Sequence, residues 1–64
     1  MKVHIWPDGT WCHAEDLHEM RWMSDDYSTL SLPEEATEDD VDTFAAMTKE
    51  FGYLDEQDIM EYFK

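Results

Sequence analysis

The sequence predicts one α+β domain, residues 1–64, in which a three-stranded antiparallel sheet carries two to three short helices packed on one face. Three observations lead to this prediction. They are a Pro-Asp-Gly turn between two short apolar segments, an alternating segment that ends at Pro33, and helical periodicity in the C-terminal half. The predicted order of elements is β-β-α-β-α-α.

The segment KVHIWPDGTWCH, residues 2–13, predicts a β-hairpin, because Pro-Asp-Gly at positions 7–9 has the backbone preferences of a turn. Two registers are compatible with this turn. A three-residue loop with a bulge at the glycine places Ile5 opposite Trp11, whereas a four-residue loop places Trp6 opposite Trp11. We favour the bulged register because it gathers apolar side chains of both strands on one face. In that register Trp6 lies on the outer face of the sheet.

Residues 14–23, AEDLHEMRWM, have apolar side chains at helical spacing and predict a short helix of two turns. Residues 27–32, YSTLSL, alternate and predict a third strand with Leu30 and Leu32 facing inward. Pro33 ends this strand because it has no N–H to donate to a neighbouring strand.

The main helix is predicted to begin at Thr37, because Asp40 follows three residues later in the pattern of a capping box. Its apolar stripe consists of Val41, Phe44, Ala45, Met47, Thr48 and Phe51. Gly52 is placed as the residue that ends this helix, with Tyr53 or Leu54 packing back. Asp55 then begins a last helix, with Ile59, Tyr62 and Phe63 on one face.

The chain is strongly acidic, with 17 Asp and Glu against 4 Lys and Arg and a formal net charge of −13. A net charge of magnitude about 2–8 is enough to keep a small domain in solution. Additional like charge destabilises the compact state, and a domain of this size has a stability of only about 3–5 kcal/mol. This composition excludes direct binding to nucleic acid or to an anionic membrane surface, and it favours a basic partner.

Some of the acids have a structural explanation, since they begin helices or serve the hairpin turn. These are Asp8, Glu38, Asp39, Asp40, Asp55, Glu56 and Asp58. The others have none, and the spacing Glu35–Asp39 and Glu38–Asp42 places like charges four residues apart if the helix extends that far. The acidity therefore exceeds what fold and solubility require.

The excess negative charge can be compared with the charge density of duplex DNA. Thirteen duplex phosphates occupy about 22 Å of helix axis, and a globule of this length has a diameter of roughly 28 Å. The carboxylates are therefore predicted to stand in for phosphates. The acids predicted to bind a partner, including two that begin a helix, are Glu15, Asp16, Glu19, Asp25, Asp26, Glu34, Glu35, Glu38, Asp39 and Asp42. Trp6 is a candidate aromatic anchor.

The sequence also contains residue types used in metal binding and in nucleophilic catalysis, but their spacing does not favour either function. Cys12, His13, His4 and His18 are of zinc-ligand type, but Cys12 and His13 are adjacent on a strand and point to opposite faces. The same adjacency opposes a nucleophile–base pair. We expect no catalytic residues, no metal and no cofactor. The single cysteine excludes an intramolecular disulfide, and no apolar run has the length of a membrane span.

Small size, the lack of a disulfide and extreme acidity make the chain resemble phage-encoded inhibitors of host defence. These include DNA mimics that block restriction enzymes, uracil-DNA glycosylase inhibitors and anti-CRISPR proteins. The blocks IWPDGTWC and WMSDDY resemble short phage proteins, among them an anti-CRISPR that acts on the type I-C system. The resemblance implies an inhibitor that covers the DNA-binding surface of a type I effector complex, near the subunit that reads the protospacer-adjacent motif.

The sequence therefore predicts a DNA-mimic inhibitor, a monomer or weak dimer that acts in the cytoplasm of an infected bacterium. Its expected partner is the basic DNA-binding surface of a host protein. One alternative is an inhibitor of another host DNA enzyme, for restriction, repair or transcription, that binds through the aromatic hairpin. A small metal-binding module is the other alternative.

Overall fold

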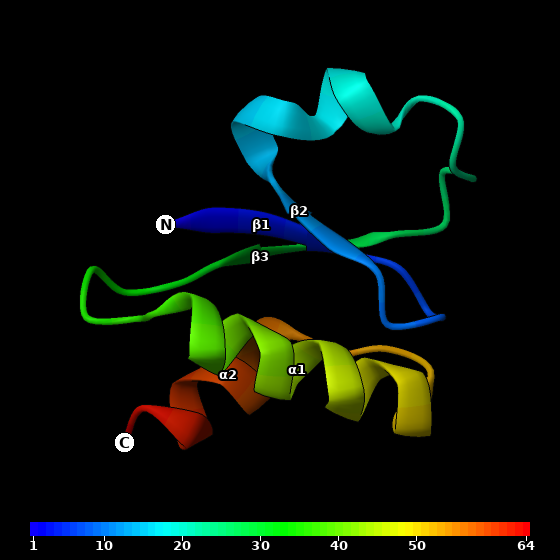
Figure 1. Ribbon diagram of the computed structural model, residues 1–64. Helices are drawn as coiled ribbons and strands as arrows, with labels where there is room; N and C mark the ends of the chain where they lie inside the picture. The colour runs from blue at the N-terminus through cyan, green and yellow to red at the C-terminus, as the bar shows by residue number, and fades with distance from the viewer.

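The computed structural model describes all 64 residues. Its elements are β1 (Lys2–Ile5), β2 (Trp11–His13), the 3₁₀ helix η1 (Ala14–Met20), β3 (Ser28–Ser31), α1 (Glu38–Phe51) and α2 (Glu56–Tyr62). The strands form one antiparallel sheet in the order β2-β1-β3, so the first strand is the central one. The helices α1 and α2 lie on one side of the sheet and η1 on the other (Figure 1). The predicted α+β fold is confirmed.

The hairpin has the bulged register. Ile5 pairs with Trp11, and the backbone N–H of Trp6 donates to the carbonyl oxygen of Thr10 at 2.7 Å. Gly9 has φ 91°, a conformation that a residue without Cβ adopts freely. Asp8 completes the turn by accepting the N–H of Thr10 at 3.0 Å, and this hydrogen bond lowers the pKa of the Asp8 carboxyl.

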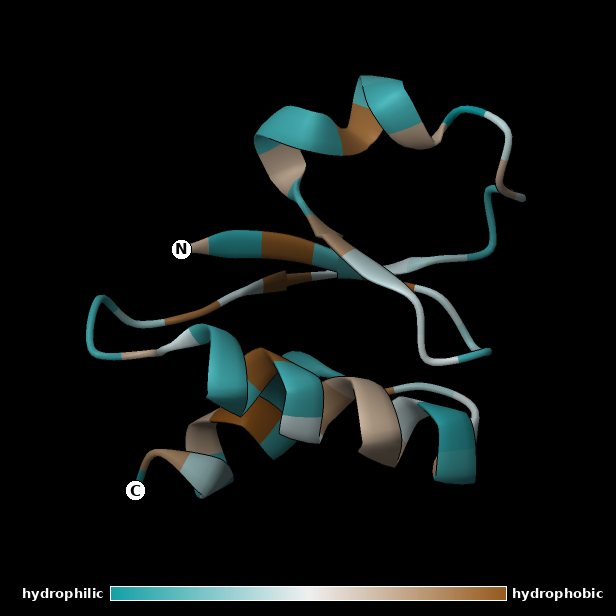
Figure 2. Ribbon diagram, in the orientation of Figure 1, coloured by the Kyte–Doolittle hydropathy of each residue, from teal (hydrophilic) through white to brown (hydrophobic).

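The core lies between the sheet and the two α-helices. Leu30 and Leu32 are buried there, as the alternation of the third strand predicts. The full core comprises Val3, Ile5, Leu30, Leu32, Val41, Phe44, Ala45, Leu54 and Ile59. Figure 2 shows mainly hydrophilic positions along η1 and the first turns of α1, and hydrophobic ones in β1 and α2. None of the helices combines the length and the apolarity needed to cross a membrane.

Both predicted helix starts are confirmed as capping boxes. Thr37 and Asp40 exchange side-chain and backbone hydrogen bonds at the start of α1, and Asp55 and Asp58 do so at the start of α2. Gly52 ends α1 with φ 94°, and its N–H donates to the Thr48 carbonyl oxygen. These local hydrogen bonds fix where each helix begins and where the first ends.

Three details differ from the sequence predictions. Phe51 is 66% exposed, because the chain reverses at Gly52 and Leu54 joins the core instead. Tyr62 is 43% exposed, since its hydroxyl reaches out to the Asp40 carboxylate. The segment after β2 is a 3₁₀ helix on the opposite side from the α-helices; the residue before it provides no side-chain cap, and short connectors commonly take this form.

Candidate functional site

The carboxylates of this protein have almost no cationic neighbours. None of the 17 Asp and Glu residues is buried. No lysine or arginine nitrogen lies within 4.0 Å of a carboxylate oxygen, and the single ion pair joins His13 Nε2 to Glu38 Oε2 at 3.4 Å. The negative charge is therefore presented to solvent without internal neutralisation.

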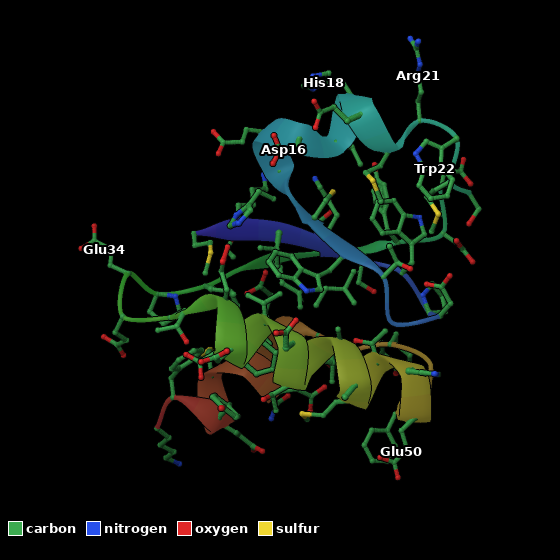
Figure 3. The ribbon with its side chains drawn as sticks, in the orientation of Figure 1. Asp16, His18, Arg21, Trp22, Glu34 and Glu50 are labelled. Atoms are coloured by element: carbon green, nitrogen blue, oxygen red, sulfur yellow. The ribbon has the colours of Figure 1, made fainter.

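The ten acids predicted to bind a partner do not form one patch; they fall into three groups. Glu15, Asp16 and Glu19 belong to η1, whereas Asp25 and Asp26 lie in the loop between η1 and β3. The remaining five are Glu34, Glu35, Glu38, Asp39 and Asp42, in the loop before α1 and at its start. Because η1 and α1 lie on opposite sides of the sheet, these groups face different directions (Figures 1 and 3).

The densest group lies where the chain enters α1. We call it the acidic α1 end; it consists of Glu34, Glu35, Glu38, Asp39, Asp40 and Asp42. Since the helix begins at Glu38, the spacing Glu35–Asp39 lies outside it. Asp42 lies one turn from both Glu38 and Asp39 and forms a like-charge pair with each. Acids in this first turn gain from the positive end of the helix dipole, which offsets part of their mutual repulsion.

Neighbouring elements hold three of these carboxylates in place. Asp42 Oδ1 accepts the indole N–H of Trp11 at 3.0 Å, and Glu38 contacts His13, so β2 orients both. Asp40 accepts the backbone N–H of Thr37 at 2.9 Å and the hydroxyl of Tyr62 at 3.1 Å. The bond from Thr37 is the main cause that lowers the pKa of Asp40, and the bond to Asp40 raises the pKa of the Tyr62 hydroxyl.

Glu34, Glu35 and Asp39 complete the acidic α1 end, and their carboxylates make no hydrogen bond or ion pair within the protein. Glu34 extends away from the ribbon in Figure 3. These three groups are available to a partner, while their oriented neighbours supply a fixed negative field around them.

No family model matches this sequence, and searches of curated proteins and of solved structures found no similar protein. Function must be inferred from the residues of this chain.

The charge density of the molecule lies between those of double-stranded and single-stranded DNA. The body measures 35 × 24 × 17 Å. A net charge of −13 along the 35 Å axis corresponds to one charge per ~2.7 Å, against ~1.7 Å for a duplex and ~3.4 Å for one strand. The measured shape is longer than the sphere assumed from the sequence, so the density is lower than predicted.

Trp6, the candidate aromatic anchor, is not accessible to a partner in this structure. Trp6 does lie on the outer face of the sheet, but it is only 1% exposed. Its indole N–H donates to the Ser24 carbonyl oxygen at 2.7 Å, and the ring of Tyr27 packs edge-on at 5.3 Å. The loop before β3 covers it. The aromatic side chains that are exposed are Trp22 at 72%, Phe51 and Tyr53 at 66% each, and Tyr62.

The predicted metal-ligand types do not converge. His4 and Cys12 face each other across the hairpin, but no group of three His, Cys, Asp or Glu residues is arranged to hold a metal ion. Burial is the main cause that raises the pKa of the Cys12 thiol, with Asp16 adding to it, so the thiolate is disfavoured.

His4 predicts a pH dependence of stability. Burial, and secondarily Lys2, lowers its pKa in the folded state, while Nδ1 contacts Thr29 Oγ1 at 2.9 Å. The unfolded state therefore binds the proton more readily. This contribution to stability is complete above pH ~6.5 and is lost as the pH falls through the lowered folded pKa.

We expect His4→Gln to flatten the decline of the unfolding free energy between about pH 7 and about pH 5. Urea unfolding at several pH values measures this, with the exposed His18→Gln as the matched control. Equal slopes for the two variants would contradict the assignment to His4.

Proposed function

We propose that this protein is a non-enzymatic inhibitor that occupies the DNA-binding surface of a partner, with carboxylates in place of phosphates. The observation that carries the proposal is that 17 exposed or partly exposed acids have no lysine or arginine within ion-pair distance. A fold of marginal stability therefore carries like-charge repulsion that no lysine or arginine of the chain neutralises. A cationic cleft would supply the missing counter-charges on binding.

The acidic α1 end is the centre of the proposed contact. Glu34, Glu35 and Asp39 are unpaired there, and the adjoining Glu38 and Asp42 are held by β2. Such an array steers association with a basic surface and makes the association rate strongly dependent on salt. The acids on η1 and in the following loop extend the negative field to the other side of the sheet.

The resemblance to phage inhibitors makes a type I CRISPR effector complex the first target to test, in the cytoplasm of an infected bacterium. Restriction, repair and transcription enzymes are the next class. Binding through the aromatic hairpin is less well supported, because the loop before β3 covers Trp6 and leaves it inaccessible to a partner. The acidic surface is the better-supported binding element for either class.

Displacement of DNA tests the proposal. Fluorescently labelled target duplex is bound to a purified type I effector complex, and its anisotropy is followed as the protein is added. We expect release of the duplex, and binding of the protein that weakens by tenfold or more when salt rises from about 50 to about 200 mM. If neither this complex nor a panel of DNA-binding enzymes releases DNA, the proposal is rejected.

A further inference from the structure

A groove of about 430 Å³ lies between η1, the loop that follows it and the outer face of the sheet. Its apolar lining consists of Trp6, Leu17, Met20, Met23 and Tyr27. This volume falls within the range of about 300–1,000 Å³ typical of ligand pockets. The groove lies on the opposite side of the sheet from the acidic α1 end, and the function proposed above does not use it.

The aromatic part of this groove is fixed in place. The Trp6 indole N–H bonds to the Ser24 carbonyl oxygen, which ties the loop to the sheet. The Tyr27 ring packs edge-on against both Trp6, at 5.3 Å, and His4, at 4.6 Å. Walls that are already ordered lose little entropy when a side chain binds. The thioethers of Met20 and Met23 complete the lining and adapt to the shape of an occupant.

One free carboxylate stands at this groove. Asp25 lines it, is exposed and makes no ion pair. Its neighbour Asp26 accepts the Ser24 hydroxyl and does not line the groove. His18 and Arg21 also lie at the rim, and Figure 3 shows Arg21 extending away from the body of the molecule.

We infer that this groove receives an arginine or lysine side chain of the cationic partner. Its aliphatic stem packs on Met20, Met23 and Tyr27, and its charged head reaches Asp25. Basic side chains combine an apolar stem with a charged tip, and aromatic faces attract the cation. A second copy of this chain is a poor occupant, because its own net charge of −13 opposes the approach.

The inference rests on the proposed function and gives it a second contact. The groove is lined by η1 and the loop after it, and η1 lies on the opposite side of the sheet from α1 (Figure 1). A partner that engages both therefore encloses the protein from two sides, as a DNA-binding cleft encloses a duplex.

The test uses the whole protein and two small probes, N-acetylargininamide and N-acetylnorleucinamide, which differ in the charged head. Each is titrated while the indole N–H resonance of Trp6 and the methyl resonances of Met20 and Met23 are followed by NMR. We expect the arginine probe to shift these resonances and to bind about three- to fivefold more tightly than the norleucine probe. Equal binding of both probes, or of neither, would overturn the inference.

The matched variants are Asp25→Asn and Asp26→Asn, which change the net charge equally. We expect Asp25→Asn to remove the preference for the arginine probe and Asp26→Asn to retain it. Equal loss in both variants would show that only the general negative field attracts the probe, and would also overturn the inference. Its failure leaves DNA displacement by the intact protein unaffected, so the two proposals are separable.

Discussion

Reversing two acids of the acidic α1 end, as Glu34→Lys with Glu35→Lys, is expected to weaken inhibition by roughly 100-fold, because placing like charges opposite each other costs several kcal/mol. The formal net charge changes by four units, from −13 to −9. Neither side chain makes an internal hydrogen bond or ion pair, so the fold is retained, and reduced self-repulsion leaves the melting temperature equal or higher. DNA displacement measures the inhibition, and circular dichroism measures the melting temperature.

The matched control reverses Glu50 and Glu61, two exposed glutamates that lie outside the acidic α1 end and are not among the acids predicted to bind a partner. Glu50 lies near the other end of α1 (Figure 3). We expect a loss of less than about fivefold, from weaker long-range attraction alone. Equal losses in the two double variants would mean that net charge, and not this surface, determines binding.

Trp6→Ala is expected to unfold a large fraction of the protein. Truncating a buried Trp costs about 3–5 kcal/mol, which equals the whole stability of about 3–5 kcal/mol available to a domain this small. The loss includes the hydrogen bond to Ser24, which holds the loop over the outer face of the sheet. Far-ultraviolet circular dichroism and urea unfolding measure the effect.

Trp22→Ala is the control for Trp6→Ala, because it removes an aromatic side chain that is not buried. Trp22 is 72% exposed, so its removal is expected to change the unfolding free energy by less than about 0.5 kcal/mol. A Trp6→Ala variant that remained as stable as Trp22→Ala would contradict the buried position of Trp6. If it remained folded and lost only inhibition, Trp6 would have to be reconsidered as a contact residue.

The parts of the fold that were predicted correctly depend on short-range chemistry. The position of the hairpin turn follows from Pro-Asp-Gly at 7–9, and the helix starts follow from the capping pairs of Thr37 and Asp55. In each case the deciding hydrogen bonds join residues a few positions apart. Such features can be inferred from a single sequence because the interacting groups are already neighbours in it.

The parts that were missed depend on which segment covers which surface. Alternation places Trp6 on the outer face, but it does not reveal that the loop before β3 closes over it. The period of α1 includes Phe51, but it does not reveal that Leu54 returns to the core in its place. The position of η1 opposite the α-helices is likewise a property of the packed chain. No local signal in the sequence distinguishes these outcomes.

The sequence predicted how many acids the candidate site could draw on, but only partly where these acids lie in the fold. Composition gives the net charge and the scarcity of cations, which the structure leaves unpaired. The segment 33–42 is dense in acids, so their gathering at the start of α1 could be anticipated. The separation of Glu15, Asp16 and Glu19 from that group could not, because it depends on the side of the sheet to which η1 packs.

The central position of β1 has a consequence for biosynthesis. This strand is synthesised before α1, and its apolar side chains Val3 and Ile5 are covered only when α1 has been made. At about 5–20 residues per second, the interval from Ile5 to Phe51 is roughly 2–9 s. A nascent or truncated chain that ends before α1 therefore exposes the apolar face of its hairpin to solvent and is prone to aggregate. Premature termination in this gene should yield insoluble fragments and not smaller working domains.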